Sequence, residues 1–262
     1  MKKLSAAAAI AGAVAAIPGP VSAQATAETT AHTLSANLGL VTEYRYRGIG
    51  QTNGDPAVQA GLDYTHASGA YAGTWWTNVS WLSDANPDVS SSLETDVYAG
   101  YRGSFGAFGY DVGVLRYLYP GSYPHGFTSP HTTELYVAGS WQTITLKYSH
   151  AVTNLFGFDD SEGAGYLEVN GSFELGGGLG LLAHVGHQRI PAGRVGGVQI
   201  RSRDDCSYTD WSLGLTKGFV GLDWKLSWID TNADGGTGEC YRNALDRDVG
   251  KSVLVLSVGK TF

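Results

Sequence analysis

The sequence predicts an all-β protein, a single antiparallel transmembrane β-barrel of about twelve strands with short periplasmic turns and longer external loops. Three observations predict this fold. Segments of about ten residues alternate apolar with polar side chains. The connections between these segments alternate between long and short, and the chain closes on an apolar strand over residues 250–262, GKSVLVLSVGKTF. A last strand ending on an aromatic residue such as Phe262 is typical of outer-membrane barrels, and an ordinary sandwich strand is the alternative.

The beginning of the chain is predicted to be a secretory signal peptide, residues 1–23. Two lysines precede an alanine-rich apolar stretch over residues 4–17, and small residues at the end of the segment form a cleavage site after Ala23. The apolar stretch is shorter than the ~20 residues that a spanning helix needs. We therefore expect an exported protein of the Gram-negative outer membrane, with a periplasmic lead-in over residues 24–33 and the barrel over residues 34–262.

The composition fits such a barrel. The 262 residues include 37 Gly, 15 Tyr and 7 Trp, and only 16% are charged. Abundant glycine and aromatic residues suit many short strands joined by turns. The formal net charge of −7 argues against nucleic acid as a partner. No cofactor is predicted.

The predicted strands follow one another along the chain. Residues 34–46 alternate, with Leu38 and Leu40 on one face and Glu43 and Arg45 on the other, and the Gly- and Asn-rich stretch after them has the composition of a turn. The same alternation recurs, interrupted by polar stretches, to the end of the chain. The predicted strands cover residues 34–46, 56–66, 70–81, 93–103, 109–119, 132–141, 143–150, 165–175, 179–189, 208–217, 222–230 and 250–262.

The strand over residues 93–103 favours a barrel over a soluble sandwich. Glu94, Asp96 and Arg102 share one face of it, whereas Val97 and Tyr101 lie on the other. A sandwich would expose the charged face to bulk water, and a barrel turns it toward an aqueous lumen.

Connection length predicts how the strands are arranged. The links after the odd-numbered strands are long and polar, whereas those after the even-numbered strands are a few residues with Gly. Because successive antiparallel strands turn at opposite ends, all long links lie on one side of the barrel. This is the outer-membrane arrangement, with tight periplasmic turns and larger external loops.

Charged side chains on the polar faces are predicted to line the interior. An acidic excess there favours the passage of cations. The alternative is that these charges pair with one another and fill a closed interior, as they do in small barrels. The candidates are Glu43, Arg45, Asp63, Glu94, Asp96, Arg102, Asp111, Glu134, Lys147, Glu168, Glu174, Asp223 and Lys225.

Cys206 and Cys240 are the only two cysteines. In an exported protein an even pair suggests a disulfide, because the compartment is oxidising. Both lie in segments on the long-loop side, so they can join two neighbouring loops. Metal binding is the weaker interpretation, since the chain has neither a Cys-x-x-Cys motif nor a histidine cluster beside them.

The other motifs give little indication of a metal site or a catalytic site. Asp230, Asn232 and Asp234 match the first half of a calcium loop but lack the bidentate Glu that completes it, so they are only a weak metal candidate. Ser149 and His150 are adjacent, so on a strand they point to opposite faces and do not make a nucleophile and base. All seven tryptophans are interpreted as an interfacial girdle: Trp75, Trp76, Trp81, Trp141, Trp211, Trp224 and Trp228.

Several blocks resemble the TorF-like porin family of bacterial exported proteins. They are GLVTEYRYRGIGQTNGDPAVQAGLDY, SGAYAGTWWTNV, ETDVYAGYRG, GYDVGVLRYLYPG, LKYSHAVTNLFG, YTDWSLGL and the terminal VGKTF. The resemblance covers nearly all of the chain after the predicted signal peptide and implies an outer-membrane barrel of porin type. It brings no catalytic or binding residues.

We therefore expect a porin-like channel for passive diffusion of small hydrophilic solutes or ions, with a weak preference for cations as a sub-hypothesis. No enzymatic activity is expected. The alternatives are an outer-membrane barrel enzyme that acts on lipid and a closed barrel with a binding or structural role in its loops. The expected partners are outer-membrane lipid, lipopolysaccharide and small hydrophilic solutes, and an oligomeric state is left open.

Overall fold

The structure, a computed structural model, describes residues 31–202 and 205–262. The predicted signal peptide, the cleavage site after Ala23 and most of the predicted lead-in lie outside these residues. The described elements are β1 (His32–Val41), β2 (Arg45–Tyr46), β3 (Ile49–Gly50), β4 (Ala57–His66), β5 (Ala70–Asn78), α1 (Trp81–Ala85), β6 (Leu93–Phe105), β7 (Phe108–Leu118), β8 (Thr132–Trp141), β9 (Ile144–Ala151), β10 (Gly165–Gly176), β11 (Leu179–Arg189), β12 (Gly193–Val195), β13 (Val198–Arg201), β14 (Tyr208–Phe219), β15 (Leu222–Thr231) and β16 (Val253–Thr261).

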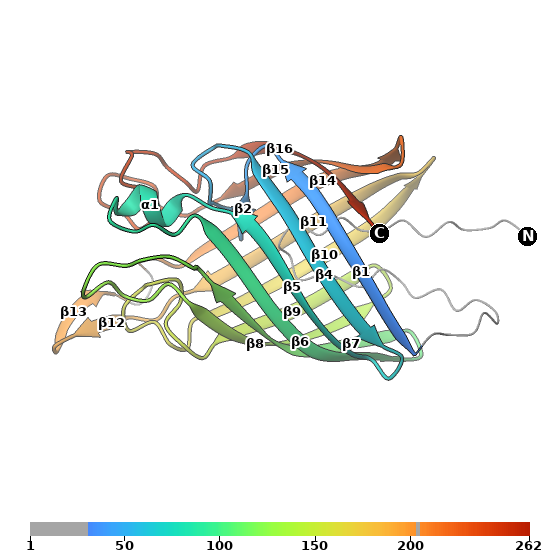
Figure 1. Cartoon of the computed structure of the whole chain (residues 1–262), viewed down its shortest axis with the longest axis horizontal. Coiled ribbons are helices and arrows are strands. Elements are labelled where there is room, and N and C mark those ends of the chain that lie inside the picture. The colour runs from blue at the N-terminus through green and yellow to red at the C-terminus, as the bar shows by residue number, and fades with distance from the viewer. Residues whose placement is uncertain (1–30, 203–204) are drawn as a thin grey trace, which may run out of the picture.

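Twelve of these strands form one closed antiparallel barrel, in the order β1-β16-β15-β14-β11-β10-β9-β8-β7-β6-β5-β4 (Figure 1). Closure is made by β1, which pairs with β4 on one side and with β16 on the other. In the second pairing Asn37 lies opposite Thr261. The predicted fold class is therefore confirmed, including the closing strand at the end of the chain.

The two ends of the barrel differ as the connection lengths predict. One end, called here the long-loop end, carries α1 and two small hairpins, β2–β3 and β12–β13 (Figure 1). The opposite end has only tight turns and is called the short-turn end. Within the described residues no helix is long and apolar enough to cross a membrane.

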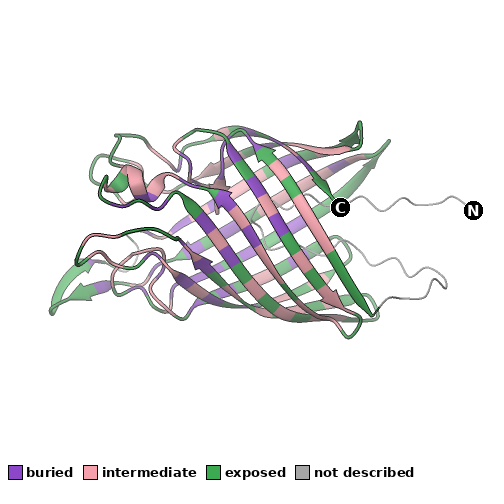
Figure 2. Ribbon diagram, in the orientation of Figure 1, coloured by how far each residue is buried: buried purple, intermediate pink, exposed green. Residues whose placement is uncertain are grey.

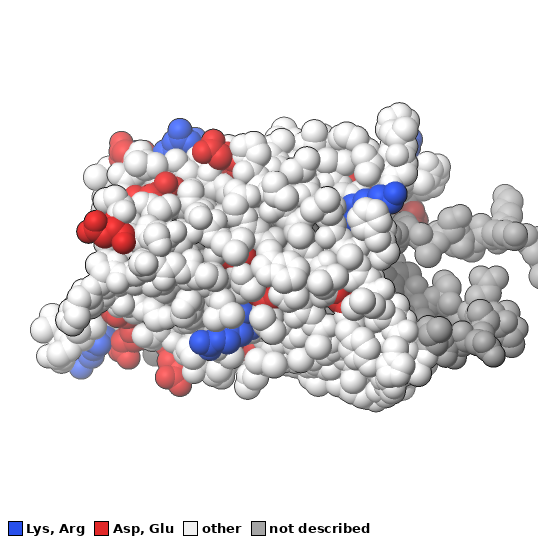
Figure 3. Space-filling view, viewed as in Figure 1, with Lys and Arg blue, Asp and Glu red and all other residues white. Residues whose placement is uncertain are grey.

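Burial alternates along the wall strands nearest the viewer, as the banded colouring of Figure 2 shows. On β8, Leu135 and Val137 are exposed, whereas Glu134 and Tyr136 are buried inside. The outer wall is accordingly apolar. On the face drawn in Figure 3, charged side chains are sparse along the barrel and more frequent over the long-loop end.

Glycine and tyrosine fit together on the inner face. Gly73 lies directly across from Tyr98, and Gly100 lies across from Tyr71. A Cβ atom on either glycine would collide with the opposing tyrosine ring. These close approaches explain why a chain rich in tyrosine also needs many glycines in its strands.

Two of the predicted strands run past the end of the observed strand into another element. The first strand was expected to continue to Tyr46, but β1 ends at Val41 and the chain then turns into the barrel. The third strand was expected to reach Trp81, but β5 ends at Asn78 and Trp81 begins the short helix α1. In both cases the alternating pattern continues beyond the point where backbone pairing with the neighbouring strand stops.

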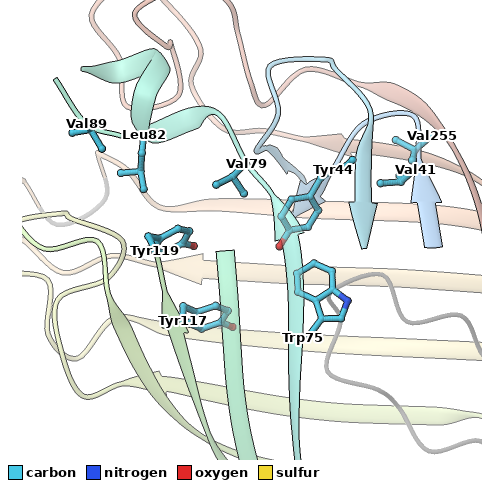
Figure 4. Close-up of a cluster of buried hydrophobic side chains, with 10 residues drawn as sticks. Val41, Tyr44, Trp75, Val79, Leu82, Val89, Tyr117, Tyr119 and Val255 are labelled. Atoms are coloured by element: carbon cyan, nitrogen blue, oxygen red, sulfur yellow. The ribbon is translucent and has the colours of Figure 1, made fainter. Parts of the chain in front are cut away.

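The assignment of all tryptophans to a girdle is wrong for two of them. Trp75 is 6% exposed and faces the interior, and Trp81 lies at the long-loop end beside Tyr119. Trp141 and Trp228 are exposed on the outer wall, as the girdle requires. A buried apolar cluster instead fills the interior near the long-loop end, where Trp75 and Tyr44 lie close together (Figure 4).

Candidate functional site

The segment over residues 42–56, called here loop 42–56, fills much of the interior near the long-loop end. Its hairpin pairs Arg45 with Gly50 and Tyr46 with Ile49. Arg47 and Gly48 form the turn, with φ of 47° and 79°. Positive φ at both central positions is the geometry of a two-residue hairpin turn, and it costs a non-glycine residue about 1 kcal/mol or more.

Contacts between the Arg47 side chain and the far wall of the barrel offset the cost of this backbone conformation. Its Nη1 and Nη2 donate to the two carboxylate oxygens of Glu134, at 2.9 and 2.7 Å. Nη1 also donates to Oε1 of Gln188 at 2.7 Å, and the guanidinium lies 4.1 Å from the centre of the Tyr166 ring. The Arg47 side chain is 8% exposed and that of Glu134 is 3% exposed. The loop is thus bound to β8, β10 and β11 at once.

The tip of the loop also touches the strands that follow. Tyr208, on β14, donates its hydroxyl to the Arg47 carbonyl at 2.9 Å. A side chain at position 48 would collide with Thr231 and Asp210, so only glycine fits there. The loop therefore reaches across the barrel rather than lying along the strand from which it leaves.

The two tyrosines of the loop meet the inner wall at different carboxylates, Tyr44 at Glu94 and Tyr46 beside Glu134. Tyr44 donates its hydroxyl to Glu94 Oε1 at 3.0 Å, and Tyr119 donates to Oε2 at 3.2 Å. The hydroxyls of Tyr46 and Tyr117 lie 2.6 Å apart, and Tyr117 donates to Glu134 Oε2 at 3.3 Å. Glu94 and Glu134 are thereby supplied with hydrogen bonds, as buried carboxylates require.

Asp96 lies beside these two carboxylates, but hydrogen bonds do not satisfy its carboxylate in the same way. Its side chain is buried, and its Oδ1 has no hydrogen-bond partner. In the sheet register Asp96 lies opposite Trp75 on β5 and opposite Tyr117 on β7. The indole N–H of Trp75 has no acceptor either.

A second polar network crosses β10, β11 and β14. His184 Nε2 lies 2.8 Å from Asp210 Oδ2, and His184 Nδ1 lies 2.7 Å from Asn170 Oδ1. Asn170 donates to Glu168 at 2.8 Å, and Lys147 Nζ is 4.0 Å from the other Glu168 oxygen. This network places Lys147 and Glu168, two of the predicted lining residues, next to each other.

A third group lies nearer the short-turn end. Tyr98 donates its hydroxyl to Asp63, and Tyr71 donates to Asp111, each at 2.5 Å. The Arg102 guanidinium lies 5.1 Å from the Tyr71 ring centre. Tyrosine hydroxyls therefore line this part of the interior together with the charges.

The remaining predicted lining residues are distributed as follows. Asp223 and Lys225 alternate inward on β15, and Lys225 lies across from Thr216 and Ser257. Glu174 is exposed near the end of β10.

Glu43 and Arg45 do not lie on a wall strand, where the sequence analysis placed them. They belong to loop 42–56, where Arg45 Nη2 is 2.8 Å from Glu43 Oε1. Arg45 also donates to the carbonyl oxygens of Gly48 and Val249 at 3.1 and 2.7 Å. Their role is to hold the loop against the segment before β16.

The side-chain oxygens of the half calcium motif accept hydrogen bonds from backbone amides. Asp230 Oδ1 accepts from the Thr231 amide, Asn232 Oδ1 from the Thr209 amide and Asp234 Oδ1 from the Gly236 amide. In the described part of the chain no three His, Cys, Asp or Glu side chains group as metal ligands would. Ser149 is buried inside while its neighbour His150 is exposed outside.

The structure contains the predicted disulfide between Cys206 and Cys240, with Cα atoms 5.6 Å apart. It joins the segment before β14 to the segment between β15 and β16. Tyr241 donates its hydroxyl to the Cys206 carbonyl at 2.5 Å, and burial raises the pKa of this hydroxyl above its ordinary value. The disulfide therefore lies within a packed cluster at the long-loop end.

Sequence reasoning missed Arg47, His184 and Asp210 as interior residues. Arg47 lay in a stretch interpreted only as a turn, and its partner Glu134 is 87 residues away. His184 and Asp210 sit at even positions of β11 and β14, the inward parity of those strands, so the alternation itself could have identified them.

A family model described as "Bacterial protein of unknown function (Gcw_chp)" matches residues 24–262. The TorF-like name stays a prediction, because the matching family carries this other description. No curated protein matches the chain.

Solved porin structures are similar in fold. The KdgM porin is 10% identical, with 87% of this chain and 98% of that chain covered and a TM-score of 0.50. The KdgM porin in complex with disordered oligogalacturonate is also 10% identical, with 87% and 99% covered and a TM-score of 0.50. An outer membrane channel from Pseudomonas putida F1 is 13% identical, with 90% and 97% covered and a TM-score of 0.49.

Proposed function

We propose a channel function for this chain, which belongs to the Gcw_chp family of bacterial proteins of unknown function. It would be a porin-like barrel in the Gram-negative outer membrane, through which small hydrophilic solutes or ions diffuse passively. The observation that carries the proposal is the closed barrel itself, apolar on its outer face and charged on its inner face. A soluble protein has the opposite arrangement, with apolar side chains inside and polar side chains outside.

The proposed location follows from the same inversion. The apolar outer band would contact lipid and lipopolysaccharide, the short turns would face the periplasm and the long-loop end would face outward. The predicted export signal supports this location, and the family match begins at the residue after the predicted cleavage site.

Two substitutions test whether the wall lies in a membrane. Val137, in the middle of β8, is 52% exposed, and Val195, in the β12–β13 hairpin, is 51% exposed. Val137→Arg is expected to lower the free energy of unfolding in lipid vesicles by about 2–4 kcal/mol, the cost of arginine at the bilayer midplane. Val195→Arg should change it little. Equal effects from the two would contradict a membrane-embedded wall.

The charge of the interior determines which solutes the channel would prefer. Acidic side chains outnumber basic ones on the inner face. Glu94, Asp96 and Glu134 lie near one another there, and of these three Glu134 is paired with Arg47. We therefore propose a preference for cations. A polyanion such as the oligogalacturonate in the KdgM complex would meet repulsion here.

The proposal is tested by ion current through the refolded protein in a planar bilayer under a salt gradient. Discrete steps with a reversal potential on the cation side are expected. Glu168→Gln should weaken the cation preference, because it leaves Lys147 without its acidic neighbour. Glu174→Gln, the same change on the same strand at an exposed position, is the matched control and should have a smaller effect. No current from a demonstrably folded barrel would overturn the channel proposal.

A further inference from the structure

Basic side chains gather on one part of the outer wall, next to the long-loop end. Arg116 on β7, His150 on β9, and His187 and Arg189 on β11 are all exposed. Each lies an even number of residues from exposed apolar residues of its own strand, so all four point away from the interior. These four residues, called here the basic sector, therefore project from a wall that is otherwise apolar.

No acidic side chain of the same wall balances the basic sector. The carboxylates on strands β7 to β11 occupy positions of inward parity: Asp111, Glu134, Glu168 and Glu174. The exposed Glu162 lies in the loop between β9 and β10. In the part of the chain that the structure describes, neither Arg116 nor Arg189 forms a salt bridge with it or with any other acid. Arg116 instead donates to the Thr133 hydroxyl at 2.7 Å.

A glycine lies at the centre of the basic sector. In the sheet register Gly165, the first residue of β10, is opposite His150 on one side and Arg189 on the other. The Tyr148 hydroxyl covers this glycine, since a Cβ atom at position 165 would come within 2.7 Å of it. The same hydroxyl lies 3.4 Å from His150 Nδ1. An imidazole, a phenol hydroxyl and a guanidinium thus stand on one row of the wall, with no side chain at position 165 to separate them.

This set of groups suits a phosphate. A guanidinium binds phosphate oxygens through two parallel hydrogen bonds, and the hydroxyl and the ring N–H are further donors. The backbones of His150 and Arg189 are about 10 Å apart, two strand spacings, so a phosphate fits between their side chains. An arginine on an apolar wall is costly unless it reaches lipid headgroups or an anion.

The height of the basic sector on the wall indicates where the phosphate would come from. Arg189 is the last residue of β11, and His150 is the second to last residue of β9. In the proposed orientation both lie where the apolar wall meets the headgroups of the outer leaflet. In a Gram-negative outer membrane that leaflet is made of lipopolysaccharide, whose membrane anchor, lipid A, carries phosphate groups on its sugars.

We propose that the basic sector binds the phosphates of lipid A. Arg189 and His150 would hold one phosphate beside the Tyr148 hydroxyl, and the acyl chains would lie along exposed leucines below it, such as Leu146 and Leu167. The inference rests on the membrane location proposed above and adds a specific site to it. Lipid binding on the outer wall does not depend on conduction through the interior.

The test is native mass spectrometry of the full chain, folded in detergent, with diphosphoryl lipid A as the probe. Lipid A from which both phosphates have been removed, and phosphatidylglycerol, are the comparison lipids. Diphosphoryl lipid A is expected to bind at least about tenfold more tightly than the phosphate-free form, because only it supplies acceptors for charge-assisted hydrogen bonds. Equal binding of these two would overturn the proposal. Equal binding of phosphatidylglycerol would reject lipid A as the occupant.

Two variants locate the site. Arg189→Gln keeps a polar side chain but removes the guanidinium, and it should weaken the binding of diphosphoryl lipid A about fivefold or more without affecting the phosphate-free form. Lys217→Gln is the matched control. It removes an exposed, outward-facing cation near the short-turn end of β14, and binding should not change. Unchanged binding in Arg189→Gln, with the barrel shown to be folded by circular dichroism, would refute the assignment.

The current measurement on the same preparation separates this inference from the channel proposal. Conduction without phosphate-dependent lipid binding would reject the lipid A site and leave the channel standing. Phosphate-dependent binding that Arg189→Gln weakens, in a barrel that carries no current, would support the site and reject the channel.

Discussion

Arg47→Ala is expected to raise the single-channel conductance at least about twofold, because it releases loop 42–56 from the interior. Arg47 connects the loop to β8, β10 and β11 through Glu134, Tyr166 and Gln188. Removing one partner of a buried ion pair costs about 3–5 kcal/mol, since the other charge is left uncompensated. The hydrogen bonds of Tyr44, Tyr46 and the Arg47 carbonyl to the wall remain, at about 1 kcal/mol each, so the loss is comparable with all three together.

The measurement is single-channel current in planar bilayers at one salt concentration. Arg242→Ala is the matched control: it removes an arginine from an ion pair with Asp246 in which the Asp246 side chain is 80% exposed. An exposed pair of this kind contributes about 1 kcal/mol or less, so conductance should not change. An unchanged conductance in Arg47→Ala would mean that the loop holds its position without the ion pair.

A double variant distinguishes release of the loop from general damage to the barrel. Arg47→Ala with Glu134→Gln removes both charges, so no buried charge is left alone and much of the lost stability should return. The conductance should stay high, because the loop still lacks its connection to the far wall. Loss of the raised conductance in the double variant would contradict this explanation.

Cys206→Ser is expected to lower the free energy of unfolding by roughly 4 kcal/mol, since the disulfide restricts the unfolded chain. It closes a loop with a sequence separation of 34, which contains β14 and β15. In the chain-entropy account, the disulfide stabilises the fold because it lowers the conformational entropy of the unfolded chain. The effect grows with the length of the closed loop. The measurement is denaturant unfolding in detergent or lipid vesicles under oxidising conditions.

The controls use the fact that the two cysteines form a single disulfide bond. Cys240→Ser should have the same effect as Cys206→Ser, and the double variant should cost no more than either, because each change breaks the same link. Reduction of the unmodified protein should reproduce the loss. A loss under about 1 kcal/mol would show that the packing around Tyr241 holds the two segments without the bond.

The wall of the barrel was predictable because each strand carries its own signal. A residue such as Val137 faces outward and its neighbour Tyr136 faces the interior, and this alternation depends only on local geometry. The pairing order followed as well, since every connection joins neighbouring strands. The two adjacent tryptophans carried a signal that the girdle interpretation did not use. Trp75 and Trp76 cannot both face outward, so one of them had to point inward.

Loop 42–56 was not predictable in the same way. The alternation of β1 continues through Glu43 and Arg45, so nothing local marks Val41 as the last wall residue. The loop turns inward because of Glu134 and Gln188, which are 87 and 141 residues from Arg47. Contacts at that separation have no pattern in the sequence itself.

The closing pair β1–β16 also determines the order in which the protein can fold. Asn37 cannot meet Thr261 until the whole wall between them exists, so the seam carries the largest loop-closure cost of the barrel and forms late. Until then β1 and β16 are edge strands, and their unpaired backbone groups can pair with strands of other chains. Loop 42–56 needs partners on β8, β11 and β14, and it can settle only when the wall has curved around it. Assembly therefore passes through a wide, unfilled sheet, and the interior is filled last.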